Sequence, residues 1–523
     1  MRLIRTLFIT TTLFAHNFLG VLTNNVYNDW LSFGGPGLDN NRNAVGERNI
    51  SPNNVNSLTI KYVIPTDNSV SATPVTFNNN VYFPDWAGFL YSVDAKTGTI
   101  NWKFKLSEKY LPQPADPQVV CRDTFAIDPT EKIIVLGTQN SLNGGGGFVL
   151  AITLQGELIW RTLIDDHPFA IITQSPTIYN GGVFIGVSST EEGAAAFSPD
   201  YVCCTFQGSF AKLDLRTGEI LWKTLMLPDN HGKPGLYSGN SVWGSAPAID
   251  PSKGLVYIAT GNNYEVPPDV VDCVKSAKTK EEMFKCHDPK NYFNAILALD
   301  INNGDVIWAV ITSPFDSWTV SCMPGVPNPE NCPEPAGPDY DFAQAPLLVK
   351  ACNKPGCPLL AIATAKSGVT WAINAATGEI FWSVESGPGW IGGGSMFGSA
   401  THKDNYIFEK PSRNSPPSTK GGAMVAIDVL TGKILWQTAN PTNAGFVAPV
   451  SYANGVVWFG SSDDNGHLYA LNANTGDILF DFVTGGTVAC GPSIVDGVVY
   501  AGSGYQRFGS GTPNNKLYVL SHL

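Results

Sequence analysis

The sequence has few charged residues and no cluster of basic ones. Lysine, arginine, aspartate and glutamate make up 15% of the 523 residues, and the formal net charge is −12. A surface that binds nucleic acid needs a patch of lysine and arginine to neutralise the phosphates. The sequence contains no such patch, so we do not expect a nucleic acid as a partner.

Apolar runs of transmembrane length are also missing from the sequence. The nearest approach is the N-terminal segment MRLIRTLFITTTLFAHNFLG, in which two arginines precede an apolar run interrupted by Thr, His and Asn. This pattern is typical of a signal peptide rather than a membrane span. We predict a signal peptide over residues 1–20 and export of the chain, either secreted or periplasmic. An uncleaved apolar tail is the alternative.

Two cysteine patterns are absent, namely zinc-ligand spacing and the C-x-x-C-H of an attached haem, so a fused c-type haem domain is excluded. Ten cysteines in an exported chain favour disulfides. The adjacent Cys203 and Cys204 permit either a vicinal disulfide or two separate partners. The pairs that could each close one loop are Cys273 with Cys286, Cys322 with Cys332, and Cys352 with Cys357.

One pattern recurs seven times. Each copy is a short apolar strand ending in a polar residue, a turn containing Gly, and a second strand ending in an aromatic residue. The alternating apolar residues are typical of a β-strand, and Gly supplies the positive φ of a tight turn. The aromatic residues that end the copies are Trp102, Trp160, Trp222, Trp308, Trp382, Trp436 and Phe480.

The aromatic residues lie 44 to 86 residues apart, which is about one four-stranded sheet per copy. A radial array of such sheets is a β-propeller. The C-terminal KLYVLSHL matches the strand before the turn but lacks the turn, and SLTIKYVIP near the N-terminus supplies an outer strand with Tyr62 near the aromatic position. We therefore predict one all-β domain over residues 21–523, an eight-bladed β-propeller closed by its two terminal strands. Seven blades are the alternative.

The repeat resembles the pyrroloquinoline quinone (PQQ) repeat of quinoprotein alcohol dehydrogenases, over nearly the whole chain from about Trp30 onward. Segments such as CCTFQGSFAKLDLRTG, YIATGNNY and GGGSMFGSAT are similar to the polyvinyl-alcohol-dehydrogenase-like branch. The resemblance implies an oxidoreductase that oxidises an alcohol, with a secondary or polymeric hydroxyl as its substrate class. It further implies PQQ and Ca²⁺ as cofactors and a separate electron acceptor. A propeller that serves as a non-catalytic scaffold is the alternative.

The resemblance also implies which residues hold the cofactors. Ser241-Val242-Trp243-Gly244 matches a T-x-W-G motif whose Trp stacks on the quinone, so Trp243 is the expected platform and Ser241 replaces the Thr. Thr260-Gly261-Asn262 matches the turn that places an Asn oxygen on the metal. Glu191 matches a metal-binding Glu, with Glu192 as a competitor shifted by one residue. The remaining residues expected to contact the quinone are Thr173, Ser188, Lys366 and Arg122.

The catalytic base is where the sequence departs from the family. Relatives carry an Asp shortly before the strand that here reads NAILALD, and this Asp takes the proton from the alcohol. The approach reads HDPKNYFNAILALD, so we predict Asp288 as the base, although it is displaced by about one residue. The closer positions are Pro or amides, which cannot act as the base. Two further departures are the location of Cys203-Cys204 in a different blade and Ser71 in place of a quinone-binding Glu.

Overall fold

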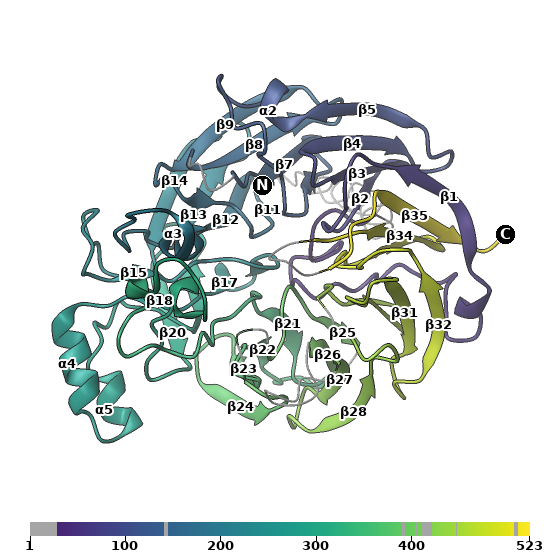
Figure 1. Ribbon diagram of the computed structural model, residues 1–523. Coiled ribbons are helices and arrows are strands. Elements are labelled where there is room, and N and C mark those ends of the chain that lie inside the picture. The colour runs from purple at the N-terminus through teal and green to yellow at the C-terminus, as the bar shows by residue number, and fades with distance from the viewer. Residues whose placement is uncertain are drawn as a thin grey trace, which may run out of the picture.

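A computed structural model describes residues 29–140, 145–389, 391, 393–402, 405–410, 421–445, 447–506 and 511–523. The predicted signal peptide lies outside these described residues. Antiparallel sheets, most of them four-stranded, are arranged around a central axis. In the sheets made of consecutive strands, the first strand lies near the axis and the last at the rim (Figure 1).

Seven sheets are built from strands that follow one another in the chain. They comprise β2–β5 (Val75–Phe77, Asn80–Pro84, Phe89–Asp94, Ile100–Lys105), β6–β9 (Ala126–Asp128, Ile133–Gly137, Gly147–Thr153, Leu158–Asp165), β10–β14 (Ala170–Ile171, Thr177–Tyr179, Gly182–Ser189, Ser209–Asp214, Ile220–Leu225), β16, β17, β19 and β20 (Ala248–Asp250, Leu255–Ala259, Ala295–Asp300, Val306–Ile311), β21–β24 (Leu347–Lys350, Leu359–Thr364, Val369–Asn374, Ile380–Glu385), β25–β28 (Ala400–His402, Asn405–Lys410, Ala423–Asp428, Ile434–Ala439) and β29–β32 (Ser451–Ala453, Val456–Gly460, His467–Asn472, Ile478–Val483). The short strands β15 (Ser238–Gly239) and β18 (Asn263–Glu265) pair with each other.

The remaining four-stranded sheet combines both ends of the chain. β1 (Thr59–Pro65) pairs antiparallel with β35 (Lys516–Ser521), which continues into β34 (Val498–Ser503) and β33 (Ser493–Val495). The predicted all-β propeller and the predicted pairing of the two end strands are confirmed. The chain supplies seven contiguous blades rather than eight, and the ring is completed by this composite sheet.

The repeated aromatic residues fasten each blade to the next. Trp160 illustrates the contact, since its Nε1–H donates to the carbonyl oxygen of Leu215 at 2.8 Å in the following blade. Its ring covers Gly218, where a Cβ would lie 2.5 Å from the indole. Tyr62 occupies the same position in the composite sheet, because its hydroxyl donates to Ala95 and its ring covers Gly98. The other tryptophans that donate in this way are Trp102, Trp222, Trp308, Trp382 and Trp436.

A segment before the first blade ties the inner strands together. Its backbone carbonyl oxygens accept hydrogen bonds from the first strands of six different blades. Arg42 within this segment is fully buried, and its guanidinium donates to the carbonyl oxygens of Phe33 and Val450. The residues whose carbonyls accept are Trp30, Leu31, Leu38, Asp39, Asn41 and Arg42.

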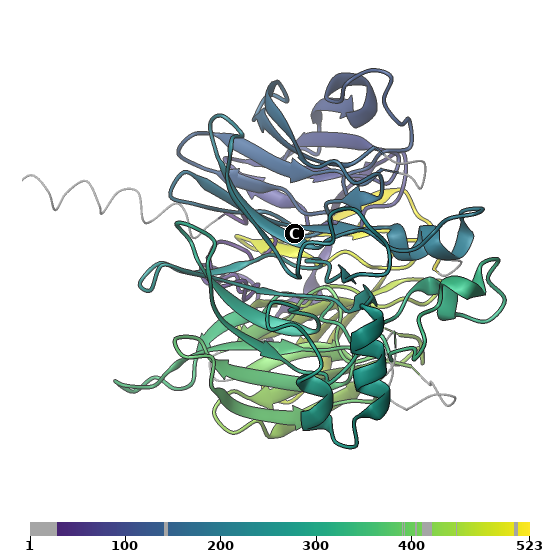
Figure 2. The same cartoon turned by 90° about the vertical axis from the view of Figure 1, so that its left-hand side faces the viewer.

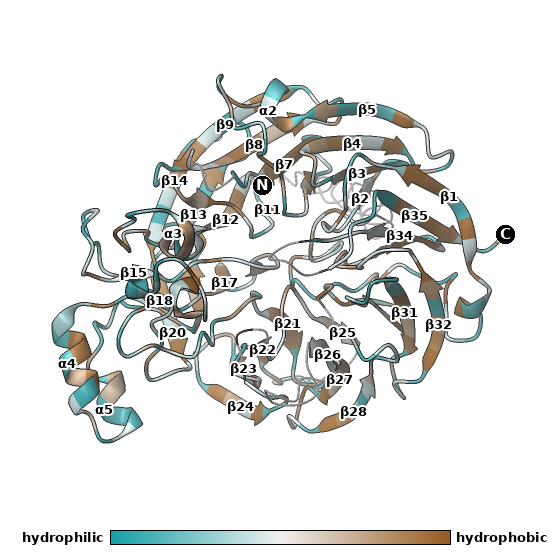
Figure 3. Cartoon of the chain, viewed as in Figure 1, coloured by the Kyte–Doolittle hydropathy of each residue, from teal (hydrophilic) through white to brown (hydrophobic). Residues whose placement is uncertain are grey.

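Helices are few and lie in loops. The helices are α2 (Leu106–Lys109), α3 (Glu191–Phe197), α4 (Pro268–Ser276) and α5 (Lys280–Phe284), together with the 3₁₀ turns η1 (Val55–Ser57), η2 (Val320–Cys322) and η3 (Pro329–Asn331). In side view, α3 and the loop carrying η2 and η3 lie on the same face of the ring (Figure 2). Apolar residues concentrate in the strands and polar ones in the connecting loops (Figure 3). Among the described residues, none of the helices has the length and apolar character to cross a bilayer.

The three predicted loop disulfides are present, and Cys203 and Cys204 form a vicinal disulfide. Cys121 and Cys490 are buried free thiols.

Candidate functional site

A pocket of about 540 Å³, partly open to solvent, lies where the inner ends of the blades meet. Most of its walls come from the loops that precede the inner strands β2, β6, β11, β16, β25, β29 and β33, so the pocket lies close to the ring axis. Polar and aromatic side chains share the lining. Those that matter below are Ser71, Arg122, Asp123, Thr173, Trp243 and Phe397.

Trp243 is the largest flat surface in this wall. It is half-buried, and its ring meets that of Phe397 edge-on with 6.2 Å between centroids. The following Gly244 has a φ of 68°, and a Cβ there would lie 2.1 Å from the carbonyl oxygen of Ala343. Glycine is therefore required directly after this tryptophan, which explains the W-G pair in the sequence.

A cluster of charges lies beside Trp243. The Trp243 Nε1–H donates to Asp341 Oδ2 at 2.8 Å, and Lys366 Nζ lies 5.4 Å from the ring centroid. Lys366 Nζ is also 2.6 Å from Asp341 Oδ1, and 3.1 and 3.2 Å from the two carboxylate oxygens of Asp339. All three charged side chains of this cluster are buried.

Glu192, the second residue of α3, adds a third carboxylate to this cluster. Burial raises the pKa of Glu192 to about 7, against the attraction of Lys366 and with the repulsion of Asp341. Burial likewise raises the pKa of Asp339 well above its ordinary value, and Lys366 only partly offsets this. The surrounding carboxylates outweigh burial at Lys366 and raise its pKa, so the ammonium stays charged. Three carboxylates thus face one ammonium.

The Asp316 side chain fixes the backbone at Asp339 and Tyr340. Its buried carboxylate accepts from the backbone N–H of Asp339 at 3.0 Å and of Tyr340 at 2.6 Å. The side-chain amide of Asn294 donates to the same carboxylate at 2.7 Å. Burial raises the pKa of Asp316 to about 6. The contacts assign Asp316 a positioning role.

The T-G-N turn lies against the same cluster. A Cβ at Gly261 would lie 3.3 Å from Asp341 Oδ2. The Asn262 side-chain amide donates at 2.9 Å to the carbonyl oxygens of both Asn263 and Trp318. Both amide hydrogens are thereby used, which orients the amide and leaves Oδ1 as the atom with ligand character.

The structure brings several predicted site residues together. Trp243 and Lys366 are in contact distance of the same carboxylate, while Arg122 and Thr173 line the pocket. Ser188 and Ser241 are buried and do not line the pocket themselves. The Ser188 hydroxyl is 2.8 Å from that of Thr173, and the Ser241 hydroxyl is 2.9 Å from that of Tyr264.

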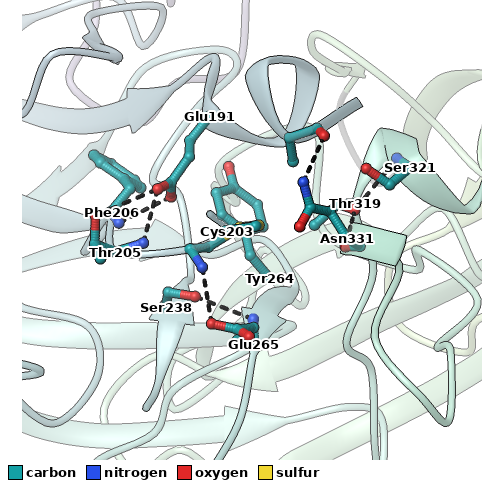
Figure 4. Close-up of a disulfide and its surroundings, with 12 residues drawn as sticks. Glu191, Cys203, Thr205, Phe206, Ser238, Tyr264, Glu265, Thr319, Ser321 and Asn331 are labelled. Carbon is teal, nitrogen blue, oxygen red and sulfur yellow. Dashed lines mark hydrogen bonds between the residues drawn. A yellow bond between two sulfur atoms is a disulfide. The ribbon is translucent and has the colours of Figure 1, made fainter. Parts of the chain in front are cut away.

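Glu191 has a different environment from its neighbour. Its fully buried carboxylate accepts from the backbone N–H of Thr205 at 2.7 Å and of Phe206 at 2.9 Å (Figure 4). It also accepts from the Tyr201 hydroxyl at 2.5 Å. Burial acts to raise the pKa of Glu191, but these donors and His167 outweigh it and hold the pKa below its usual range. The protein itself therefore saturates the Glu191 carboxylate with donors, whereas Glu192 is the residue that interacts electrostatically with Lys366 and Asp341.

Asp288 is not brought to the site. It is exposed, and its carboxylate accepts from the backbone N–H of Lys290 at 2.7 Å, two residues on in its own turn. The vicinal disulfide is buried away from the pocket. The backbone N–H of Cys204 donates there to the Glu265 carboxylate at 2.8 Å (Figure 4). The pocket lining includes neither Asp288 nor the two cysteines.

Sequence reasoning missed Asp316, Asp339 and Asp341. The available signal was the pair of acidic motifs Phe315-Asp316-Ser317-Trp318 and Asp339-Tyr340-Asp341-Phe342, which flank a Pro- and Cys-containing insertion. Only the folded chain shows that the two motifs meet.

Comparison with known proteins identifies the family of the chain. Residues 48–323 match the family model described as the β-propeller domain of glucose/ethanol/alcohol dehydrogenase. The chain belongs to this family. Residues 365–507 match a second model, described as outer membrane protein assembly factor BamB.

Two similar relatives are named polyvinylalcohol dehydrogenase. The one from Pseudomonas sp. is 28% identical over 494 residues, which cover 86% of this chain and 69% of the relative. The one from Sphingopyxis sp. (strain 113P3) is 26% identical over 516 residues, covering 89% of this chain and 72% of the relative.

Solved structures show the same fold. The quinohemoprotein alcohol dehydrogenase from Comamonas testosteroni superimposes with a TM-score of 0.69 at 17% identity, covering 97% of this chain and 82% of that one. A europium-containing methanol dehydrogenase gives 0.70 at 15% identity, covering 96% and 100%. The predicted resemblance and class are confirmed, and the protein is an oxidoreductase of the quinoprotein alcohol dehydrogenase type.

Proposed function

We propose that this protein oxidises the hydroxyl group of a secondary or polymeric alcohol, using PQQ and Ca²⁺, and passes the electrons to a separate acceptor. The observation that carries the proposal is the Trp243 ring beside the Lys366, Asp339 and Asp341 cluster, at the edge of the axial pocket. The substrate class follows from relatives named polyvinylalcohol dehydrogenase. We also propose that the chain is exported, either secreted or periplasmic.

The pocket residues fit a planar, polyanionic cofactor. Trp243 offers an aromatic platform, which suits a flat ring system. Arg122 and Thr173 lie in the same wall and can donate to carboxylates, while Lys366 reaches the platform edge. PQQ, when bound, supplies the two-electron acceptor for oxidation of an alcohol.

The charge cluster fits a hard divalent cation. Glu192, Asp339 and Asp341 carry two more negative charges than Lys366 neutralises when all are ionised, and Ca²⁺ prefers carboxylate and amide oxygens. In the described part of the chain, no three acidic, histidine or cysteine side chains already converge as a metal site, and the Lys366 ammonium lies between Asp339 and Asp341. We propose Glu192 and Asn262 as cation ligands, with Glu191 supporting them from behind.

Asp339 is the proposed general base. An efficient base has a pKa near the working pH, and the raised pKa of the Asp339 carboxylate moves it in that direction. Asp341 is held by both Trp243 and Lys366, so it positions these two groups. Lys366 stays protonated and stabilises negative charge that develops beside it.

Reconstitution tests the proposal. The purified protein is incubated with PQQ and Ca²⁺, desalted, and examined for quinone absorbance and for dye reduction with primary, secondary and polymeric alcohols. We expect retained PQQ and dye reduction with secondary or polymeric alcohols. A protein that retains no PQQ would act as a binding or assembly scaffold and not as this enzyme.

A further inference from the structure

The two acidic motifs of the site are the two ends of one long loop. The loop, Ser317–Pro338, leaves the site at Asp316 and returns at Asp339. Its base is closed by the Gly337 N–H, which donates to the carbonyl oxygen of Ser317 at 2.7 Å. We call residues 317–338 the brace loop. The disulfide between Cys322 and Cys332 staples its outer part.

The brace loop holds the C-terminal end of α3. The Asn331 side-chain amide donates at 2.9 Å to the carbonyl oxygens of both Ala195 and Tyr201. The Asn328 side-chain amide donates to Ala195 at 3.2 Å and to Ser198 at 2.7 Å. The last carbonyls of a helix have no partner within it, so these amides act as its cap.

The other end of α3 is fixed as well. Glu191, its first residue, is held by Tyr201, Thr205 and Phe206. A seven-residue helix is not stable by itself in water, so both sets of contacts are needed to define its geometry. Glu192 follows directly, and its carboxylate interacts electrostatically with Lys366 and Asp341.

We infer that the brace loop is a positioning element for Glu192, and that opening the Cys322–Cys332 staple weakens the cation site. The inference rests on the proposed function in taking Ca²⁺ as the ligand of Glu192. Asn328 and Asn331 act through α3 and touch no reacting atom. Groups that orient a metal ligand commonly change metal affinity by about 10- to 100-fold when removed.

The matched test compares two loop disulfides of similar span. One variant, Cys322→Ser with Cys332→Ser, opens the brace loop, and the other, Cys273→Ser with Cys286→Ser, opens the α4–α5 hairpin. Ca²⁺ binding to each protein is measured by calorimetry without substrate. We expect affinity lower by about 10-fold or more in the first variant and unchanged in the second. Equal Ca²⁺ affinity in both variants would overturn the inference.

Hydrogen exchange of the α3 amides provides a readout independent of the cation. The brace-loop variant and Asn331→Leu should both exchange faster than wild type at Gly193–Ser198, while the hairpin variant should not. Unchanged α3 exchange in both would show that the loop does not hold the helix. If the wild-type protein binds no Ca²⁺, the proposed cation fails, and with it the role of the loop at Glu192. Faster exchange would then assign the loop a purely structural role.

Discussion

At the residue scale, two adjacent glutamates have opposite environments. Glu191 is saturated by backbone and hydroxyl donors, whereas Glu192 faces the charge cluster. Glu192→Gln should lower Ca²⁺ affinity by about 10-fold or more, because a ligand is lost with little effect on folding. Glu191→Gln should instead lower the free energy of unfolding by about 2 kcal/mol, since it weakens charge-assisted hydrogen bonds.

Calorimetric Ca²⁺ titration and chemical denaturation of both variants separate the two roles. A Glu191→Gln protein of wild-type stability that has lost Ca²⁺ affinity would contradict this assignment and restore Glu191 as the ligand.

The base assignment can be tested with a matched pair of aspartates. Asp339→Asn should lower kcat by about 10²- to 10⁴-fold with PQQ retained, because an amide cannot accept the proton. Asp288→Asn should leave kcat unchanged, since the Asp288 side chain is exposed and its carboxylate accepts a hydrogen bond within its own turn. Steady-state kinetics on the reconstituted proteins give both values. Loss of turnover in Asp288→Asn alone would reverse the assignment.

The pocket wall also carries a buried acid, Asp123. Its carboxylate accepts from the Cys121 thiol at 2.7 Å and the Gly137 N–H at 2.9 Å, and burial raises the pKa of Asp123 to about 8. Between about pH 4 and pH 8 the folded protein keeps a proton that the unfolded chain has lost. This group therefore makes the free energy of unfolding fall as pH rises through that window, by up to about 1.4 kcal/mol per pH unit.

Asp123→Asn should remove this contribution. Thermal unfolding between pH 5 and pH 8 should show a wild-type Tm that declines with pH relative to the variant. Parallel Tm profiles would show that Asp123 is ionised in the folded protein.

At the element scale, the blade-to-blade contact is the repeated unit of stability. Gly218 and Gly181 both have a φ of 74°, but a Cβ at Gly218 would lie 2.5 Å from Trp160, whereas nothing lies within 4 Å at Gly181. Gly181→Ala should cost about 1–2 kcal/mol for the left-handed backbone alone. Gly218→Ala should cost more, because it also displaces the docking tryptophan. Equal losses in denaturant unfolding would mean that the Trp160 contact contributes little.

The elements that local sequence specifies were predictable. The turn chemistry and the docking aromatics depend on residues a few positions apart, and even Tyr62 was placed correctly from its strand pattern. The loops were not. Asp339 reaches Lys366 only because Asp316 captures the end of the brace loop, and no local pattern encodes that contact. Whether Glu191 or Glu192 interacts with the charge cluster depends in the same way on the contacts that hold α3, which no local pattern encodes.

At the scale of the whole molecule, the ring is closed by pairing the two ends of the chain, and the segment at Trp30–Arg42 joins six inner strands. This architecture brings loops from distant parts of the sequence to one axial pocket. The fold class and the family could be predicted from the repeat, because every copy repeats the same local physics. The proposed base, Asp339, could not be predicted in this way, because its position is set by an insertion outside the repeat.

The central claim is that Trp243 is the platform for PQQ in the axial pocket. Absorbance titration with PQQ and Ca²⁺ on the wild-type protein and on Trp243→Ala tests it most directly, with Trp382→Ala, a docking tryptophan, as the control for loss of an indole. We expect one PQQ per wild-type chain and binding that is strongly weakened only in Trp243→Ala. Wild-type protein that binds no PQQ, or Trp243→Ala that binds it equally well, would contradict the account.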